Sequence, residues 1–350
     1  MPRRYARPVP AADAAPTSLP ASWYVHPDHY ERERHAIFER TWLCVGFAHQ
    51  VAGPGDYVAD TVAGFGVFVQ RGTDGALRGF HNVCPHRAGP IVWPGQGCVG
   101  NLVCRYHGWA FEPDGKLRAA RDFGADVPGV DGLQPLAVGE WRGLVFACLD
   151  PSAEPLAGWL GHFPEVAEPF PLESYRFHRR DVHRLAANWK CYADNYLEGY
   201  HIPLVHPALT RAVDIGRYTV TAHDGGRWNR HDVPTRPGAA TAGAWAFLYP
   251  HLALNIYPTG MNVERLIPRG PQETDVVFDY FFADPDHPSA AASIAASSEL
   301  MAEDKRIVEA VQQNLAGGRY DTGLLSPRHE VGLTSFQALV RQALEAAATP

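Results

Sequence analysis

Two short motifs between residues 84 and 107 constrain this chain more than any other part of its sequence. The first is Cys84-Pro85-His86-Arg87, and the second is Cys104-Arg105-Tyr106-His107-Gly108-Trp109. Each motif offers one thiolate and one imidazole. Cys and His at such short spacings, beside the turn residues Pro and Gly, predict a metal centre.

The distribution of the ligands separates two kinds of metal centre. A zinc finger with two Cys and two His usually has both Cys in one loop and both His in the other. Here each loop carries one of each. That arrangement suits a Rieske [2Fe–2S] cluster, in which one iron takes Cys84 and Cys104 and the other takes His86 and His107. We predict such a cluster here rather than scattered buried cysteines and surface histidines.

The bulk properties leave room for a second domain. The 350 residues are 46% hydrophobic and 20% charged, which is typical of a globular protein with sizeable cores. The formal net charge of −7 argues against nucleic-acid and anionic-membrane binding, since both require a basic face. No apolar stretch approaches the length of a membrane span or of a secretory signal. The six Cys show no disulfide framework, so we predict a cytoplasmic protein.

The pattern along the chain predicts an α+β protein in three parts. Residues 1–40 form a Pro- and Ala-rich arm (1–22) and a helix from Pro27. Residues 41–155 have short apolar runs between Gly, Pro and Asp turns, which is typical of a small antiparallel β domain. Asp114-Gly115 is a strong hairpin signal within it. Residues 156–350 form the third part.

The third part mixes helical and strand patterns. We expect helices at about 188–200, 289–316 and 334–347. We expect strands at about 216–222, 245–257, 261–267 and 274–282. Residues 223–244 contain Gly225-Gly226 and a Pro- and Gly-rich run, so they predict a long flexible loop.

A second candidate metal site lies in the segment 188–207. His201 and His206 stand five residues apart, which on an unbroken helix would place them on different faces. Pro203 makes an unbroken helix improbable, and a turn there could bring both imidazoles to one point. Two His and one carboxylate form the facial triad of mononuclear non-haem Fe(II), which leaves positions open for O₂. A Rieske cluster only transfers electrons, so a second metal that needs electrons is its natural partner.

The carboxylate of such a triad has to come from elsewhere. The candidates are Asp194, Glu198, Asp214, Glu303 and Asp304. Asp304 shares a helical face with the apolar residues 307, 308 and 311, where an acid is unfavourable unless it is paired or metal-bound. Glu303 is expected to face solvent. Glu198 is well placed to hydrogen-bond His201 rather than to bind the metal. The sequence therefore favours Asp304.

Four aromatic residues are candidates for a substrate pocket. Trp245, Phe247, Tyr249 and Tyr257 could line it or form a cation–π cage for a quaternary ammonium group. They follow strand spacing, so ordinary core packing is the competing interpretation for each of them.

With these motifs in place, the chain resembles the Rieske non-haem iron oxygenases, specifically their catalytic α subunit. Asn82 to Arg87 and Cys104 to Trp109 look like the family's cluster loops, and Asn188 to Pro207 looks like its iron motif. The resemblance implies that His201, His206 and Asp304 bind iron. It implies that Glu198 is the acid that passes electrons between subunits. Asn188, which opens the iron motif, is a further candidate for supporting the ligands.

Later motifs are similar to the subgroup that acts on quaternary ammonium compounds such as choline, glycine betaine, carnitine and stachydrine. They include Leu254 to Pro258, Val277 to Phe282 and the stretch from Glu303. The resemblance implies a Rieske domain of antiparallel strands and a helix-grip catalytic domain, in which an antiparallel sheet wraps a long C-terminal helix. It also implies a homotrimer, in which His107 of one subunit delivers electrons toward Glu198 of the next.

The expected function is that of a terminal oxygenase component. It would use O₂ and electrons from NAD(P)H, delivered by a separate flavin- or iron–sulfur-containing reductase, because the chain has no nucleotide-binding Gly-rich fingerprint. The substrate would be a small organic molecule, with N-demethylation or hydroxylation of a quaternary ammonium compound as the first hypothesis. Ring hydroxylation or O-demethylation of an aromatic compound is the alternative, and a Rieske electron carrier without oxygenase chemistry is a third.

Overall fold

The computed structural model describes residues 15–124, 127–236 and 243–347, and they form two compact units. One unit comprises Phe38–Trp159. The other joins the N-terminal segment up to Ile37 with the chain from Leu160 onward. The expected α+β class with antiparallel sheets is confirmed.

The unit Phe38–Trp159 is built on a seven-stranded antiparallel sheet. Its strands, in spatial order, are β1 (Leu43–Phe47), β10 (Leu144–Cys148), β9 (Pro135–Trp141), β4 (Leu77–His81), β3 (Phe65–Arg71), β2 (Asp56–Val62) and β5 (Gly95–Cys98). The β2–β3 turn is Ala63-Gly64, and both residues have the positive φ that a tight hairpin of this kind requires.

A small three-stranded sheet completes this unit, with β6 (Leu102–Val103), β7 (Ala110–Phe111) and β8 (Leu117–Ala119). The predicted Asp114-Gly115 turn joins β7 to β8. Gly115 has φ +88°, and a Cβ there would lie 2.3 Å from the Phe80 ring. Both the backbone conformation and the packing therefore require Gly at this turn.

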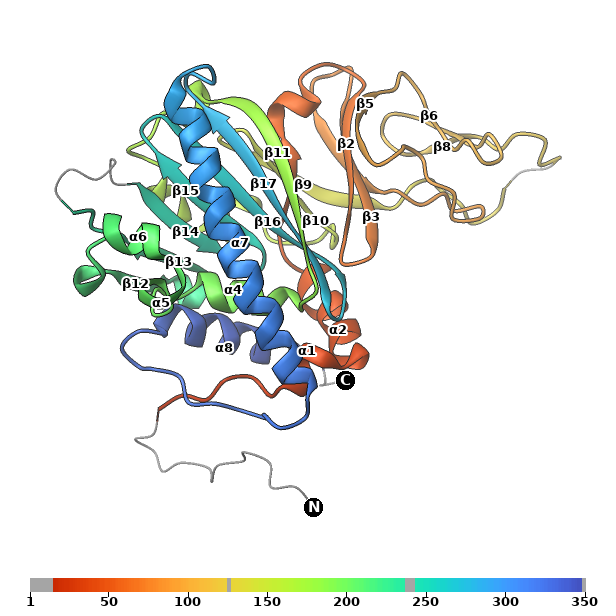
Figure 1. Cartoon of the computed structure of the whole chain (residues 1–350). Helices are drawn as coiled ribbons and strands as arrows, with labels where there is room; N and C mark the ends of the chain where they lie inside the picture. Colours follow the sequence, from red (N-terminus) through yellow and green to blue (C-terminus); the bar gives the residue numbers. More distant parts are fainter. Residues whose placement is uncertain (1–14, 125–126, 237–242, 348–350) are drawn as a thin grey trace. The chain divides into compact units, whose positions relative to one another are not determined.

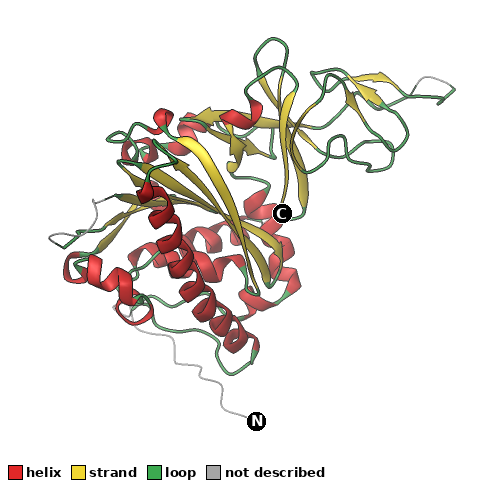
Figure 2. Cartoon of the chain, turned by 45° about the horizontal axis from the view of Figure 1, so that its top comes forward, coloured by secondary structure: helices red, strands yellow, loops and turns green. Residues whose placement is uncertain are grey.

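The second unit is built on another seven-stranded antiparallel sheet, crossed by a long helix (Figures 1 and 2). In spatial order the strands are β11 (Arg176–Leu185), β17 (Glu273–Phe282), β16 (Gly260–Gly270), β15 (Leu252–Tyr257), β14 (Ala244–Leu248), β13 (Trp228–Asp232) and β12 (Thr219–His223). The helices of the chain are α1 (Ser22–Val25), α2 (Pro27–Glu33), α3 (Leu156–Leu160), α4 (Trp189–Tyr196), α5 (Ile202–Val205), α6 (Pro207–Ala212), α7 (Pro288–Ala316) and α8 (Val331–Ala346).

Several sequence-based boundaries need correction. The predicted strand 245–257 is two strands, β14 and β15, joined by a turn. The predicted loop 223–244 contains strand β13, while its residues 237–242 lie outside the described part. Most of the predicted arm 1–22 also lies outside it. The predicted apolar face of α7 is wrong at Ile307 and Val311, which are 39% and 43% exposed. The buried face of α7 is formed by Ala290, Ile294, Met301, Val308 and Gln312.

A buried ion pair fastens the N-terminal helix α2 to α4. The Lys190 ammonium donates to Glu33 at 2.6 Å, and both side chains are fully buried. Trp189 Nε1 donates to the other Glu33 oxygen at 2.8 Å, and Lys190 also donates to Asn188. The charges of the pair are compensated only while both partners are present.

Replacing Glu33 with Gln is expected to destabilise this unit by about 3–5 kcal/mol, because Lys190 would be left as an uncompensated buried charge. The measurement is urea unfolding followed by tryptophan fluorescence. The matched control is Glu31→Gln on the same helix, where the ion pair with Arg34 is largely exposed and its loss should cost less than about 1 kcal/mol. Equal effects of the two variants would contradict the assignment.

Candidate functional site: two metal centres and a pocket

The two cluster motifs form loops with the same backbone geometry. In the first, Ala88 N donates to Cys84 O and Cys84 N donates to Gly89 O. In the second, Gly108 N donates to Cys104 O and Cys104 N donates to Trp109 O. The fourth residue after each Cys has positive φ, 54° at Ala88 and 78° at Gly108. Equivalent loops present equivalent ligands, one Cys and one His each.

The side chains of these loops fit an iron–sulfur cluster. Cys84 and Cys104 are free, buried thiols, and the ring centroids of His86 and His107 are 4.7 Å apart. His86 Nδ1 is buried and has no hydrogen-bond partner among the described residues. A buried nitrogen is left unpaired at a free-energy cost, and ligation of a metal would remove that cost. Trp109 stacks on the His86 ring with centroids 4.8 Å apart, which fixes that imidazole.

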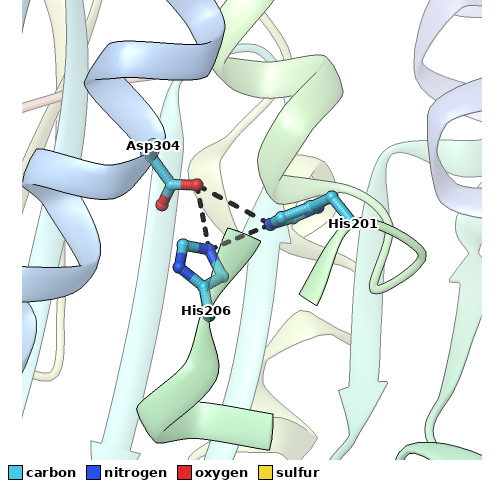
Figure 3. A group of neighbouring side chains, drawn as sticks. All are labelled: His201, His206 and Asp304. Atoms are coloured by element: carbon cyan, nitrogen blue, oxygen red, sulfur yellow. Dashed lines mark hydrogen bonds and ion pairs between the residues drawn. The ribbon is translucent and has the colours of Figure 1, made fainter. Parts of the chain in front are cut away.

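The second site is assembled from three segments of the other unit. His201 directly precedes the one-turn helix α5, and His206 directly follows it. Pro203 and Pro207 occupy first-turn positions of α5 and α6, where Pro is tolerated, and they break the segment into short helices. This brings both imidazoles to one point opposite Asp304 of α7, as Figure 3 shows.

The three side chains bring their ligand atoms close enough together to bind one metal ion. His201 Nε2 and His206 Nε2 are 3.1 Å apart. Asp304 Oδ1 lies 3.0 Å from His206 Nε2 and 3.6 Å from His201 Nε2. Burial lowers the pKa of His206, but Asp304 and Glu303 outweigh it, so this pKa lies above its ordinary value. The carboxylates thus favour positive charge between the rings, which a divalent cation would supply.

Each imidazole is oriented by a second carboxylate on its far nitrogen. His201 Nδ1 lies 2.5 Å from Glu198 Oε1, and His206 Nδ1 lies 2.7 Å from Glu303 Oε2. An ionised carboxylate only accepts hydrogen bonds, so each Nδ1 carries the proton and each Nε2 presents its lone pair. Two lone pairs 3.1 Å apart fit a metal ion between them. This is the donor set of a mononuclear non-haem iron site.

The structure places the other sequence candidates differently. Glu303, expected in solvent, bonds His206. Asp194 bonds Tyr24 and Gln337 instead of the triad. Asn188 does not contact the triad: its side chain caps α4 through Lys190 N, bonds the Lys190 ammonium and donates to Pro271 O. Asn188 therefore supports the helix that leads to the site, because capping is what an Asn at the start of a helix provides.

A cavity of about 730 Å³, counting its mouth, opens at the triad. Of the four aromatic candidates, Trp245 and Tyr257 line it, and Trp245 Nε1 donates to the Tyr257 hydroxyl at 2.9 Å. Phe247 and Tyr249 do not line it, because they pack in the core against Phe336 of α8. The remaining wall residues are Tyr192, Asn195, Tyr196, Glu198, Ile202, Leu209, Tyr218, His231, Asn255, Asn262, Glu264, Phe278, Ser297, Leu300 and Met301.

Three residues around the triad carry a signal in the sequence itself. Glu303 is adjacent to Asp304 on a helix, and Asn195 lies on the iron-motif helix and donates to Asp304 Oδ1 at 2.7 Å. Glu264 lies near the apolar residues Val263, Leu266 and Ile267, in a strand whose residues 260–268 are buried, which is an unfavourable position for an acid that has no function there. The residue is 5% exposed, and its carboxylate accepts hydrogen bonds from Tyr192, Asn255 and Asn262.

Replacing Glu303 with Ala is expected to weaken binding of the mononuclear iron roughly 10- to 100-fold, because His206 would lose the group that fixes its tautomer and ring orientation. The measurement is competition for Fe(II) with a chelator, followed by metal analysis. Glu299→Ala, an exposed acid on the same helix, is the control. Unchanged iron affinity in the Glu303 variant would refute this role.

No helix in the described part of the chain is long and apolar enough to cross a membrane.

Comparisons with known proteins agree with this architecture. Residues 41–131 match the model of the Rieske [2Fe–2S] domain, and residues 172–346 match that of the ring hydroxylating alpha subunit (catalytic domain). The chain is 32% identical to the carnitine monooxygenase oxygenase subunit of Escherichia coli (strain K12), covering 87% of this chain and 85% of that protein. It is 30% identical to choline monooxygenase, chloroplastic, of Beta vulgaris, over 96% of this chain and 79% of the relative.

A solved structure of a quaternary ammonium Rieske monooxygenase superposes with a TM-score of 0.83 at 28% identity, covering 94% of this chain and 96% of that one. The family models together span the cluster loops and the His-rich site. A cluster domain and a catalytic domain in one chain explain why two metal centres are built here. The chain belongs to the Rieske non-haem iron oxygenases and is a catalytic α subunit of that family.

Proposed function

We propose that this protein is the oxygenase component of a system that oxidises a quaternary ammonium compound. The observation that carries the proposal is the cavity at the triad, whose wall combines aromatic side chains, among them Trp245, Tyr257 and Phe278, with a buried carboxylate. Aromatic faces attract quaternary ammonium groups, which cannot donate hydrogen bonds. The relatives named for choline and carnitine oxidation support the same class of substrate.

The residues around the triad would divide the work. His201, His206 and Asp304 would hold Fe(II), which supplies a site for O₂ activation when bound. Glu198 and Glu303 would keep the imidazoles in the ligating tautomer. The aromatic wall would hold the cation against the triad and exclude water. Overall, O₂, two electrons and two protons would convert a C–H bond of the substrate to C–OH and release water. A hydroxylated N-methyl group would then leave as formaldehyde.

The electrons would come from NAD(P)H through a separate reductase and would pass between subunits of a homotrimer. The surfaces around the two centres support a second copy as the partner. Trp93 and Tyr106 beside the cluster loops are 60% and 56% exposed, and Tyr200 and Leu204 beside Glu198 are 59% and 90% exposed. Large exposed apolar side chains are what an oligomer interface covers. Inter-subunit electron transfer is also described for the solved relative. The cytoplasmic location stays a prediction.

The test is a turnover panel with the iron-loaded oxygenase, a reductase and NADH. Choline, glycine betaine, carnitine and stachydrine form one arm, and benzoate and methoxybenzoates form the other. The proposal expects substrate-dependent O₂ consumption in the first arm, with formaldehyde where an N-methyl group is oxidised. Coupled turnover of aromatic acids alone would overturn it in favour of the aromatic alternative. Electron transfer to the cluster without coupled turnover of any compound would favour the carrier hypothesis.

A further inference from the structure

The pocket contains one acid that the metal sites do not use. Glu264 of β16 lines the cavity and is 5% exposed. Its carboxylate accepts hydrogen bonds from the Tyr192 hydroxyl at 3.0 Å, Asn255 Nδ2 at 2.6 Å and Asn262 Nδ2 at 3.0 Å. All three donors are neutral. Such donors orient a carboxylate and lower the cost of burying it, but they do not balance its charge.

No Lys or Arg in the described part of the chain forms an ion pair with Glu264. The adjacent Arg265 is engaged elsewhere: its guanidinium bonds Asp279 at 3.1 Å. Successive residues of a strand point to opposite faces of the sheet, so Glu264 and Arg265 are separated by the sheet itself. Buried acids are normally paired with a cation or a metal. The described part of the protein therefore supplies no cationic side chain to balance the charge of Glu264.

The surroundings of Glu264 suit a bulky cation. Directly opposite it on the neighbouring strands are Ala253, a small residue, and Phe278, whose ring lines the same cavity. Glu264, its partner Tyr192 and the triad all line this one cavity. A cation beside Glu264 would thus share the cavity with the triad, where a C–H bond of a carbon attached to its nitrogen could be oxidised.

We propose that Glu264 is the countercharge that selects the cationic headgroup of the substrate, a role that rests on the function proposed above. Asn255 and Asn262 hold its carboxylate toward the pocket, and the aromatic wall surrounds the alkyl groups of the cation. The aromatic faces alone would accept neutral groups of the same shape. The carboxylate adds a preference that depends on charge, because a neutral group leaves the buried acid uncompensated.

The electrostatics of the pocket agree with this role. Burial, helped by the charge of Asp304, raises the pKa of Glu264 to about 8, while Tyr192 and Asn255 work in the opposite direction. The other titratable groups facing it are Tyr196, Tyr257 and Tyr280. Burial raises the pKa of each, and the charge of Glu264 raises it further. A cation bound beside Glu264 would favour its charged form and lower this pKa.

The experiment compares each quaternary ammonium compound with an isostere whose headgroup is neutral. The probes are choline against 3,3-dimethylbutan-1-ol and glycine betaine against 3,3-dimethylbutanoate, in which a tert-butyl group replaces the trimethylammonium group. Binding is measured by calorimetry on the full-length holoprotein. Glu264→Gln should weaken binding of the quaternary ammonium compound roughly 10- to 100-fold. It should change the affinity for the tert-butyl isostere by no more than about threefold. The ratio of the affinity for the quaternary ammonium compound to that for its isostere therefore falls by about an order of magnitude.

Controls separate charge recognition from structural damage. Glu264→Asp keeps the charge and should retain most of the preference for the cation. Glu273→Gln removes an exposed acid at the start of β17 and should change nothing. The cluster spectrum and thermal unfolding report folding, and the aspartate variant carries the test if the glutamine variant does not fold.

The outcomes distinguish the two proposals. If the wild type oxidises quaternary ammonium compounds but Glu264→Gln weakens cation and isostere equally, only the role of Glu264 is overturned. An aspartate variant with no preference for the cation, in a folded protein, overturns it too. If the wild type neither binds nor oxidises any of the quaternary ammonium compounds, the proposed function fails first, and the role of Glu264 fails with it.

Discussion

Asp304→Ala is expected to lose the mononuclear iron and reduce product formation below detection, while the visible spectrum of the cluster stays unchanged. Asp304 supplies the only carboxylate oxygen within 4.8 Å of both free imidazole nitrogens in the described chain. Without it, two neutral nitrogens remain, and the charge that favours a dication between them is gone. The cluster ligands belong to the other compact unit, so their chemistry should not change.

The measurement combines iron analysis, the cluster absorption spectrum and product assay on the same preparation. Glu299→Ala on the same helix is the control, because it removes an acid whose side chain is exposed. Surviving turnover in the Asp304 variant would mean that another group completes the site. Loss of both metal centres would mean that the variant has lost its fold and not only a ligand.

Glu198→Gln is expected to slow product formation on the order of 10- to 100-fold, with both metal centres still bound. Glu198 accepts hydrogen bonds from the backbone N of Tyr200 and His201 as well as from the His201 ring. An amide oxygen can replace these acceptors and hold the ring. It carries no charge, so its hydrogen bonds along the electron path would be weaker than those of the carboxylate.

Rapid mixing of reduced protein with O₂ separates the electron-transfer step from substrate binding. Oxidation of the cluster should slow in the glutamine variant and recover in Glu198→Asp, which keeps the charge. Loss of the mononuclear iron would instead assign Glu198 a role in holding the metal site. Unchanged cluster oxidation would exclude it from the electron path.

The strand assignments show where sequence patterns reach their limit. Strand β11 carries the sequence RFHRRDVHRL and is mostly exposed, so its hydrophobic signal is weak, and only its pairing with β17 makes it a strand. β13 was predicted as loop because Gly- and Pro-rich residues surround it. Its backbone hydrogen bonds to β12 and β14 decide its conformation. The residue pattern of β13 itself does not reveal this pairing.

The same limit applies to the aromatic pocket candidates. Trp245, Phe247 and Tyr249 lie two residues apart, so a strand pattern gives them the same face. The tertiary structure divides that face along its length: Trp245 meets the cavity, while Phe247 and Tyr249 meet Phe336 of α8. Which helix covers which end of a strand is a long-range fact that local periodicity does not contain.

The two Cys–His motifs predicted the cluster from sequence alone, because four candidate ligands in two short loops indicate both the kind of metal centre and the local fold, and the match to the Rieske domain agrees with it. The spacing around Pro203 likewise indicated a second site at His201 and His206. The sequence also favoured Asp304 as their partner and placed Glu198 beside His201. Only the tertiary structure brought Glu303 to the His206 ring and placed Glu264 in the wall of the same cavity. Ligands that lie in one short segment can be recognised from their spacing in the sequence, whereas groups from separate helices and strands meet only when the chain packs its core.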